Sequence, residues 1–273
     1  ALNGITGIDC FDFWVNELLQ HGYLHNHARM WFASIWIHTL NLPWQLGADF
    51  FLKNLLDGDT ASNTLSWRWV AGLHTQGKCY LATENNIKKF TNNRFNKKKE
   101  LSIKPKNLNY EFFAYKLKEF NFNNKGLENN IFLINLNTIS YEYETLEKLS
   151  KNKICMVKSF IENDSSKLVR SFNKKAIVDY ITKLKNKNIS VNIFENLADF
   201  NHFLKKNNHK KIYTFYPGLG RQNDIICSLI NEYKYDVIFE YDKFDEMCWP
   251  YATSGFFKFK KKIPHFLDKI TKN

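Results

Sequence analysis

Cysteine is scarce in this sequence, and its spacing forms no recognisable framework. The 273 residues include five cysteines. That number is odd, and the five are scattered along the chain with no CxxC pair. The pattern argues against a disulfide scaffold and against a zinc ribbon, and it is typical of proteins kept in a reducing cytosol. We therefore expect a cytoplasmic protein.

Long apolar runs and metal-binding motifs are missing as well. No stretch approaches the roughly 20 apolar residues that span a bilayer, and the N-terminus carries no signal peptide, so we expect no membrane partner. His21 and His25 lie four residues apart, but no Glu follows in the HExxH sense, so we predict no metal site. Apolar residues are nevertheless plentiful at 44%, enough to bury a core.

The net charge of +12 and the tryptophans lie in different parts of the chain. Residues 1–96 contain seven Lys/Arg and seven Asp/Glu, together with six of the seven tryptophans. Residues 97–273 contain 32 Lys/Arg and 20 Asp/Glu, which is the whole excess. Such different compositions predict two domains, at 1–96 and 127–273, joined by a linker at 97–126. The stretch Thr91–Lys106 at this join fits a disordered linker and an ordered loop equally well.

The predicted fold class is an all-α domain followed by an α/β domain with a mostly parallel sheet. Apolar residues at helical spacing and a stop at Gly22 favour helices in the first part. These are expected at Asp9–His21, Leu24–Leu40, Ala48–Leu56 and within Asp59–Ala71. In the second part, β-rich runs alternate with helical patterns, as in βαβ units. The predicted strands are Ile131–Leu136, Ile154–Ile161, Ile189–Phe194, Lys211–Tyr216 and Val237–Tyr241. The helices between and after them are Glu142–Ser150, Lys174–Lys187, Leu197–Lys206 and Asn223–Tyr233.

Polar residues recur among the aromatic ones of the first domain. Asn26 and Arg29 are three residues apart and share a helical face. Asp57, Asp59 and Asn63 cluster at a turn and the following helix start, where Asp59 can act as the N-cap. From the residues alone, two interpretations stay open: a convergent polar set in a cofactor pocket, and a buried Arg–Asp pair that only stabilises the core.

The motifs in this block resemble the FAD-binding helical domain of the DNA photolyase/cryptochrome family. The spacing needs no gap over about 65 residues. The matching positions are Gly4-Ile5-Thr6-Gly7, Asp12, Gly22-Tyr23-Leu24-His25-Asn26-His27-Ala28-Arg29-Met30, Ala33-Ser34, Trp44-Gln45-Leu46-Gly47, Leu56-Asp57-Gly58-Asp59, Asn63 and Trp67-Arg68-Trp69.

The resemblance implies FAD as the cofactor and assigns residues to it. Arg29 would pair with Asp57, and Asn63 would face flavin N5, where an amide is the choice typical of photolyases. The implied FAD-binding residues are Asn26, Arg29, Asp57, Gly58, Asp59 and Asn63. Trp67 and Trp44 match the inner two members of the family's electron-transfer chain. The other tryptophans Trp14, Trp31 and Trp36 we interpret as packing residues.

The resemblance also implies a DNA substrate. Asn26, Met30 and Trp69 match positions that line the lesion pocket, where a flipped-out pyrimidine dimer would stack. His27 stands where the family usually has Arg, which weakens a phosphate contact. The implied function is light-driven repair of cyclobutane pyrimidine dimers in UV-damaged DNA by electron transfer from reduced FAD, in a monomer. A cryptochrome-like blue-light photoreceptor without repair is the alternative, and a flavin-free structural relic is a third.

The family's phosphate-binding loop and outermost tryptophan belong upstream of Gly4, and this sequence begins at Ala1. We therefore expect an N-terminally truncated photolyase-like lyase that, by itself, binds FAD poorly and is inactive. In the second domain, Leu168–Leu204 faintly resembles part of the family's antenna domain, which would imply an antenna chromophore of unknown identity. A generic five-stranded α/β domain is the alternative. The loop Tyr216–Arg221 fits a phosphate cradle and a simple turn, and Lys258–Lys262 fits a solvated helix end and a nucleic-acid contact.

Overall fold

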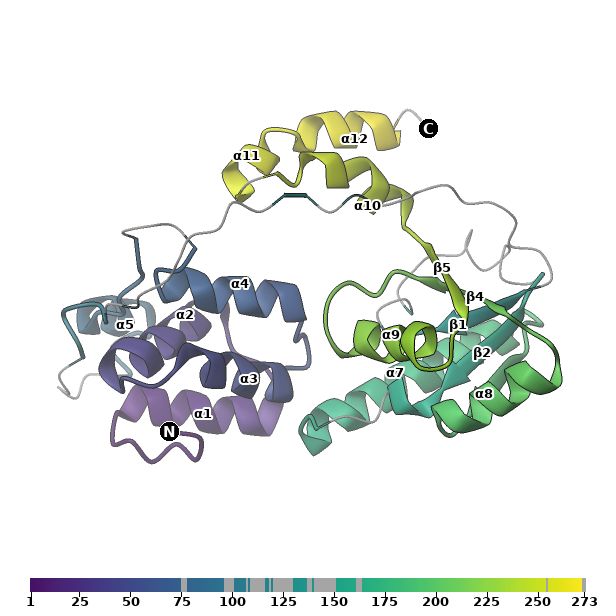
Figure 1. Cartoon of the computed structure of the whole chain (residues 1–273). Helices are drawn as coiled ribbons and strands as arrows, with labels where there is room; N and C mark the ends of the chain where they lie inside the picture. Colours follow the sequence, from purple (N-terminus) through teal and green to yellow (C-terminus); the bar gives the residue numbers. More distant parts are fainter. Residues whose placement is uncertain are drawn as a thin grey trace. The chain divides into compact units, whose positions relative to one another are not determined.

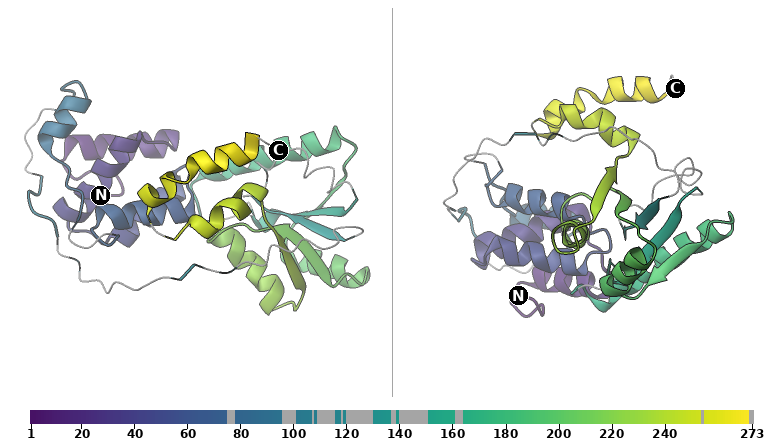
Figure 2. Two further views of the ribbon diagram at one scale, coloured as in Figure 1. Left: turned by 90° about the horizontal axis from the view of Figure 1, so that it is seen from above. Right: turned by 45° about the vertical axis from the view of Figure 1, so that its right-hand side comes forward.

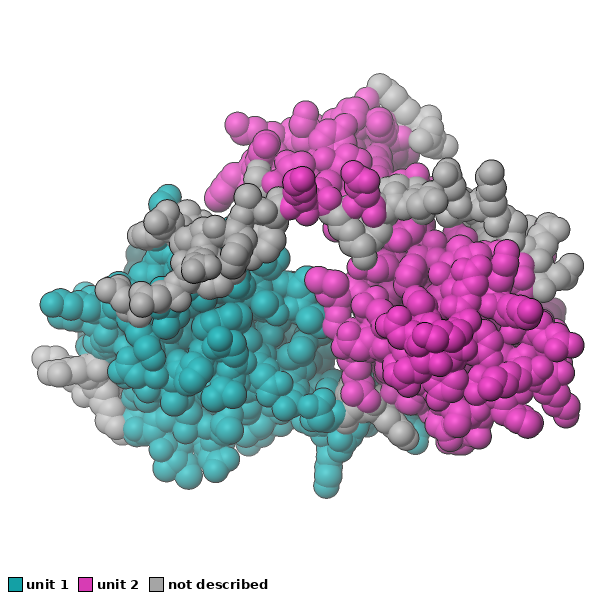
Figure 3. Space-filling model, viewed as in Figure 1, with its two compact units in different colours: residues 1–111, 162–175 teal, residues 112–161, 176–273 magenta. Residues whose placement is uncertain are grey.

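The computed structural model describes residues 1–74, 78–95, 101–106, 108, 116–117, 119, 130–136, 139, 151–160, 164–253 and 255–271. Two compact units divide the chain: unit 1 is residues 1–111 and 162–175, and unit 2 is residues 112–161 and 176–273 (Figure 3). The domain boundaries at residues 96 and 127 stay predictions. Among the described residues, no helix is both long enough and apolar enough to cross a membrane.

Unit 1 is helical in its described N-terminal part (Figure 1). Its elements are α1 (Asp9–His21), α2 (Asn26–Ser34), the π-helical turn η1 (Ile35–Thr39), α3 (Trp44–Asn54), α4 (Thr60–Val70) and α5 (Glu84–Phe90). The prediction for α1 is confirmed to the residue, and Gly22 ends the helix with a φ of 65°, in the left-handed region that glycine tolerates. The helix predicted to begin at Ala48 begins at Trp44 instead, because Pro43 can occupy the N-cap of α3.

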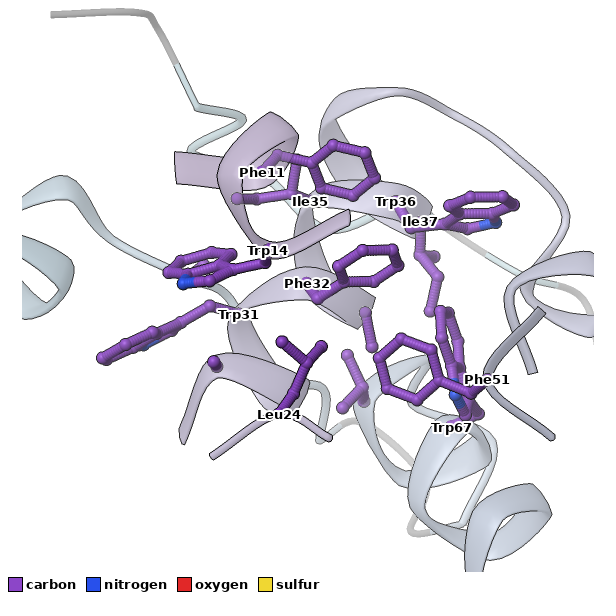
Figure 4. Packing of buried hydrophobic residues seen from close by; sticks show 14 of the residues in the cluster. Phe11, Trp14, Leu24, Trp31, Phe32, Ile35, Trp36, Ile37, Phe51 and Trp67 are labelled. Carbon is purple, nitrogen blue, oxygen red and sulfur yellow. The ribbon is translucent and has the colours of Figure 1, made fainter. Parts of the chain in front are cut away.

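An aromatic core holds these helices together (Figure 4). Phe32 on α2 stacks on Phe11 of α1, with ring centroids 4.4 Å apart, and lies 4.8 Å from Phe51 of α3. Trp14 and Trp31 stack at 5.5 Å on another side of the same cluster. Each large ring removes much apolar surface from water, so this cluster is the main stabilising element of unit 1.

The loop before α1 is fixed by one carboxylate. Asp12 accepts hydrogen bonds from the Thr6 backbone N–H at 2.9 Å, the Thr6 hydroxyl at 2.7 Å and the Gly7 N–H at 2.8 Å. The G-x-T-G motif is therefore a loop that wraps the side chain of an acidic residue in the first turn of a helix. That position also suits the helix dipole.

The stretch between the predicted domains is ordered where the structure describes it. Ser102 N–H donates to the Thr39 hydroxyl over 3.1 Å, and Lys106 N–H donates to His38 Nδ1 over 3.0 Å. Residues 101–106 are thus an ordered loop on unit 1, which decides between the two interpretations for these six residues. Most of the predicted linker at 97–126 lies outside the described residues.

Unit 2 contains a parallel sheet of five strands in the order β3-β2-β1-β4-β5, as predicted (Figures 1 and 2). The strands are β1 (Ile131–Ile134), β2 (Lys153–Val157), β3 (Val191–Phe194), β4 (Lys211–Phe215) and β5 (Asp236–Glu240). The remaining elements are η3 (Lys158–Phe160), α7 (Lys167–Lys185), α8 (Leu197–Lys206), α9 (Arg221–Asn231), α10 (Lys243–Cys248), η4 (Trp249–Tyr251), α11 (Phe256–Lys260) and α12 (Ile263–Thr271). The helix predicted at Glu142–Ser150 lies outside the described residues.

Successive residues of β1 point to opposite faces of this sheet. Ile131 and Leu133 pack with α8 and α9, whereas Phe132 and Ile134 pack with residues of α7. Helices therefore cover both faces, as a buried parallel sheet requires.

Candidate functional site

The predicted Arg29–Asp57 pair forms, and it lies at the surface of unit 1. Arg29 Nη2 is 3.0 and 2.9 Å from the two carboxylate oxygens of Asp57. The side chains are 25% and 55% exposed. Arg29 Nε also donates to the Leu24 carbonyl over 2.8 Å, so the guanidinium is held at two points. A core ion pair would be buried, so the burial of this one does not fit the purely structural interpretation.

The turn between α3 and α4 carries the acidic half of the site. Asp57, Gly58 and Asp59 are all exposed. The Asp59 side chain accepts from Ser62 N–H over 2.7 Å, which makes it the N-cap of α4, as predicted. Both carboxylates therefore lie at the start of α4, with Asp57 oriented by Arg29.

Amide groups complete this rim. Asn26 is the first residue of α2, exposed, and one turn before Arg29 on the same helix. Asn63 lies one turn into α4, where its Nδ2 donates to the Ala48 carbonyl over 2.8 Å. Helix α2 also packs on α4 and α4 on α3. Amide, guanidinium and carboxylate groups are thus gathered around one helix start.

Trp67 lies directly beneath this rim, on α4, and is 2% exposed. Its ring is 5.1 Å from Phe51, 6.3 Å from Trp36 and 6.4 Å from Phe32, centroid to centroid (Figure 4). Gly47 on α3 makes this approach possible, because a Cβ at that position would be 2.2 Å from the Trp67 indole.

Trp44 starts α3 and lies one turn before Gly47. It is half-buried and packs at the edge of the aromatic core. Trp36, interpreted from the sequence as a packing residue, is the indole in ring contact with Trp67. The relative contributions of Trp44 and Trp36 to electron transfer stay open to experiment.

The predicted lesion-binding residues are also distributed around α2 and α4. Met30 is half-buried on α2, and Trp69 is 40% exposed on α4. Trp69 stacks on Tyr80 at 5.6 Å. Burial raises the pKa of the Tyr80 phenol, and a hydrogen bond with Trp31 acts in the opposite direction.

Sequence reasoning missed α5 and the residues around it. His27 stacks on Trp31 at 5.5 Å and on Phe90 of α5 at 5.4 Å. Trp31 Nε1 donates to Asn86 of the same helix over 2.9 Å. The only available signal was the N-cap threonine at position 83, whose hydroxyl accepts from Asn86 N–H.

In unit 2 the candidate phosphate loop joins β4 to α9. Gly218 and Gly220 have φ angles of 75° and 114°, which other residues rarely adopt. Gln222 in the first turn of α9 accepts from Leu136 N–H over 3.1 Å and donates to the Phe160 carbonyl over 2.8 Å. Its side chain thus ties the loop to neighbouring strands, and a phosphate role for the loop stays a prediction.

Unit 1 is thus a helical unit with an exposed polar rim above a buried tryptophan. Residues 2–100, which include every predicted site residue, match the family model described as the FAD binding domain of DNA photolyase. This segment of the chain belongs to the DNA photolyase/cryptochrome family.

Several curated relatives are similar over part of this segment. A deoxyribodipyrimidine photo-lyase of Streptomyces griseus is 45% identical over 73 residues, which are 27% of this chain and 16% of that protein. The photo-lyase of Agrobacterium fabrum is 44% identical over 69 residues, 25% of this chain and 14% of the relative. That of Escherichia coli is 34% identical over 82 residues, 30% and 17%. The matches therefore span about a sixth of these relatives' length, and no solved structure matches the chain.

Proposed function

We propose that this protein acts in light-driven repair of cyclobutane pyrimidine dimers in DNA, with reduced FAD as the electron donor. The observation that carries the proposal is the solvent-accessible Arg29–Asp57 pair, set within a segment that matches a photolyase FAD-binding domain. An exposed ion pair contributes little to stability, so its presence in an otherwise apolar helical unit points to ligand binding.

The residues present fit a flavin. An isoalloxazine ring offers hydrogen-bond acceptors and donors along its edges and two apolar faces. Arg29 supplies donors, Asp57 supplies acceptors, and the amide of Asn63 supplies either. The apolar core beneath them, with Trp67, supplies packing surface and an oxidisable ring.

The protein groups act here by binding and orienting. When bound, FAD supplies the light-excited electron that opens the dimer, so no side chain has to act as acid or base. The hydrogen bonds from Arg29 to the Leu24 carbonyl and to Asp57 hold the guanidinium rigidly before any ligand arrives. Asn63, whose Nδ2 is fixed by the Ala48 carbonyl, is in turn pre-oriented toward the rim. Such preorganisation lowers the entropic cost of binding.

The lesion side of the proposal rests on residues of α2 and α4. Asn26 can hydrogen-bond to a base edge, and Met30 and Trp69 offer a soft side chain and an indole face to a dimer turned out of the helix. The exposed ring of Trp69 is the member that a solvent-borne base can reach directly.

A repair assay tests the function. The flavin-loaded protein is mixed with an oligonucleotide that carries one thymine dimer, and restored DNA is counted in blue light and in darkness. Restoration only in light supports the proposal, and Trp69→Ala should reduce it at limiting DNA concentration. Flavin photoreduction without any restored DNA would contradict repair and favour the photoreceptor alternative.

A further inference from the structure

An unassigned row of aromatic side chains continues from Trp69 across unit 1. Trp69 stacks on Tyr80 with ring planes 26° apart, and Tyr80 is hydrogen-bonded with Trp31. Trp31 stacks on His27 at 21°, and His27 stacks on Phe90 at 16°. Each ring thus touches the next, and the row ends on α5, a helix to which the resemblance assigns no role.

The outer members of this row face solvent. Phe90 is 54% exposed and Trp69 is 40% exposed, and His27 is exposed as well. Trp31 behind them is buried and holds α5 through its hydrogen bond to Asn86. Exposed rings braced by a buried one keep their orientation in solvent at little entropic cost, which suits them to stacking on a ligand.

Positive charge lies at the same end of the row. Lys88 and Lys89 are exposed in the last turn of α5. Lys89 Nζ lies over the Phe90 ring, 5.4 Å from its centroid. Rings that can stack on bases beside lysines that can reach phosphates are the combination used by proteins that bind single-stranded nucleic acid.

We propose that His27 and Phe90, with Lys88 and Lys89, bind the unpaired DNA that flanks the extruded dimer. The inference rests on the proposed function, because Trp69 at the other end of the row is the expected lesion contact. One or two unstacked bases would lie on the Phe90 and His27 rings while the lysines neutralise the adjoining phosphates. The row would thereby compensate for the Arg that His27 replaces, by stacking where the family uses charge.

The test is DNA binding in the dark, which does not depend on photochemistry. A fluorescein-labelled duplex with one thymine dimer, and the same duplex undamaged, are titrated with the protein and followed by anisotropy. Phe90→Ala should weaken binding of the dimer duplex about tenfold, as expected for one lost base stack. Phe90→Tyr, which keeps a ring, should restore it. Phe90 is more than half exposed, so the variants should fold, and circular dichroism verifies this.

The lysines are tested by the salt dependence of the same affinity. Lys88→Gln/Lys89→Gln should flatten the slope of log K against log salt by about 1.4, at about 0.7 for each phosphate of a single strand. The matched control is Lys205→Gln/Lys206→Gln, an exposed pair in the last turn of α8, which should leave the slope unchanged.

The possible failures are distinguishable. If Trp69→Ala abolishes the preference for dimer DNA but Phe90→Ala binds like the unmodified protein, the α5 surface is overturned while the proposed function stands. If the unmodified protein has no preference for dimer DNA, both are overturned. An equal loss of slope in the α8 control would mean that charge acts non-specifically, and this too would overturn the inference.

Discussion

At the scale of single residues, one glycine sets the position of the central indole. Gly47 is buried in the middle of α3, and a Cβ there would meet two ring carbons of Trp67 at 2.2 and 2.5 Å and Trp36 Nε1 at 3.0 Å. Both indoles are almost fully buried, so neither can move aside freely. The glycine of the W-x-x-G motif is thus explained by packing on Trp67.

This explanation fixes the sign of a substitution. Gly→Ala inside a helix usually stabilises a protein by roughly 0.5–1 kcal/mol. We expect Gly47→Ala to destabilise instead, by about 1–3 kcal/mol, because the core becomes overpacked. Urea unfolding measures the difference, and Gln45→Ala, at an exposed position of α3, should stay within about 0.5 kcal/mol. A Gly47→Ala variant as stable as the unmodified protein would refute the packing argument.

At the scale of elements, a buried histidine anchors the loop at residues 101–106. His38 lies in η1, Nε2 is 3.2 Å from the Val70 carbonyl, and Nδ1 accepts from Lys106 N–H over 3.0 Å. These partners require the neutral tautomer with the proton on Nε2. Burial lowers the pKa of His38 below its ordinary value of 6.5, and the positive charge of Lys106 adds to this effect.

The loop should therefore loosen in acid. Because the pKa is lower in the folded protein, the neutral imidazole stabilises the fold fully above pH 6.5. That contribution is lost as the pH falls toward the folded-state pKa. Hydrogen exchange should show a falling protection factor for the Lys106 amide below about pH 6. The Ser102 amide, bonded to the Thr39 hydroxyl, has no titrating partner and serves as the internal control. Equal pH dependence of both amides would argue against the His38 anchor.

At the scale of the whole molecule, periodicity predicted most of the elements that touch the site. The parallel sheet of unit 2, helix α1, the Asp59 cap and the Arg29–Asp57 pair were all predicted from spacing, resemblance and simple capping rules. These features depend on residues near one another in sequence, or on a charge that needs a partner.

What the sequence did not reveal depends on tertiary contacts. Helix α5 has seven residues and a single buried side chain, Ile87, so it has no amphipathic period to detect. Its place is determined by His27 and Trp31, about sixty residues earlier. The ring contact between Trp36 and Trp67 likewise depends on how α3 and α4 cross, which spacing alone does not specify.

The central claim is that the Arg29–Asp57 pair binds flavin and does not serve mainly to hold the fold. The most direct measurement is an FAD titration, by flavin fluorescence, of the chain, of Asp57→Asn and of Asp49→Asn. Asp49 is the matched control, since it is 54% exposed and paired with Lys53. We expect Asp57→Asn to weaken FAD binding at least about tenfold, the loss typical of a charged hydrogen bond. Its unfolding free energy should change by less than about 1 kcal/mol, and Asp49→Asn should bind FAD like the unmodified chain. Equal FAD affinity in all three proteins, or unfolding of Asp57→Asn, would contradict the account.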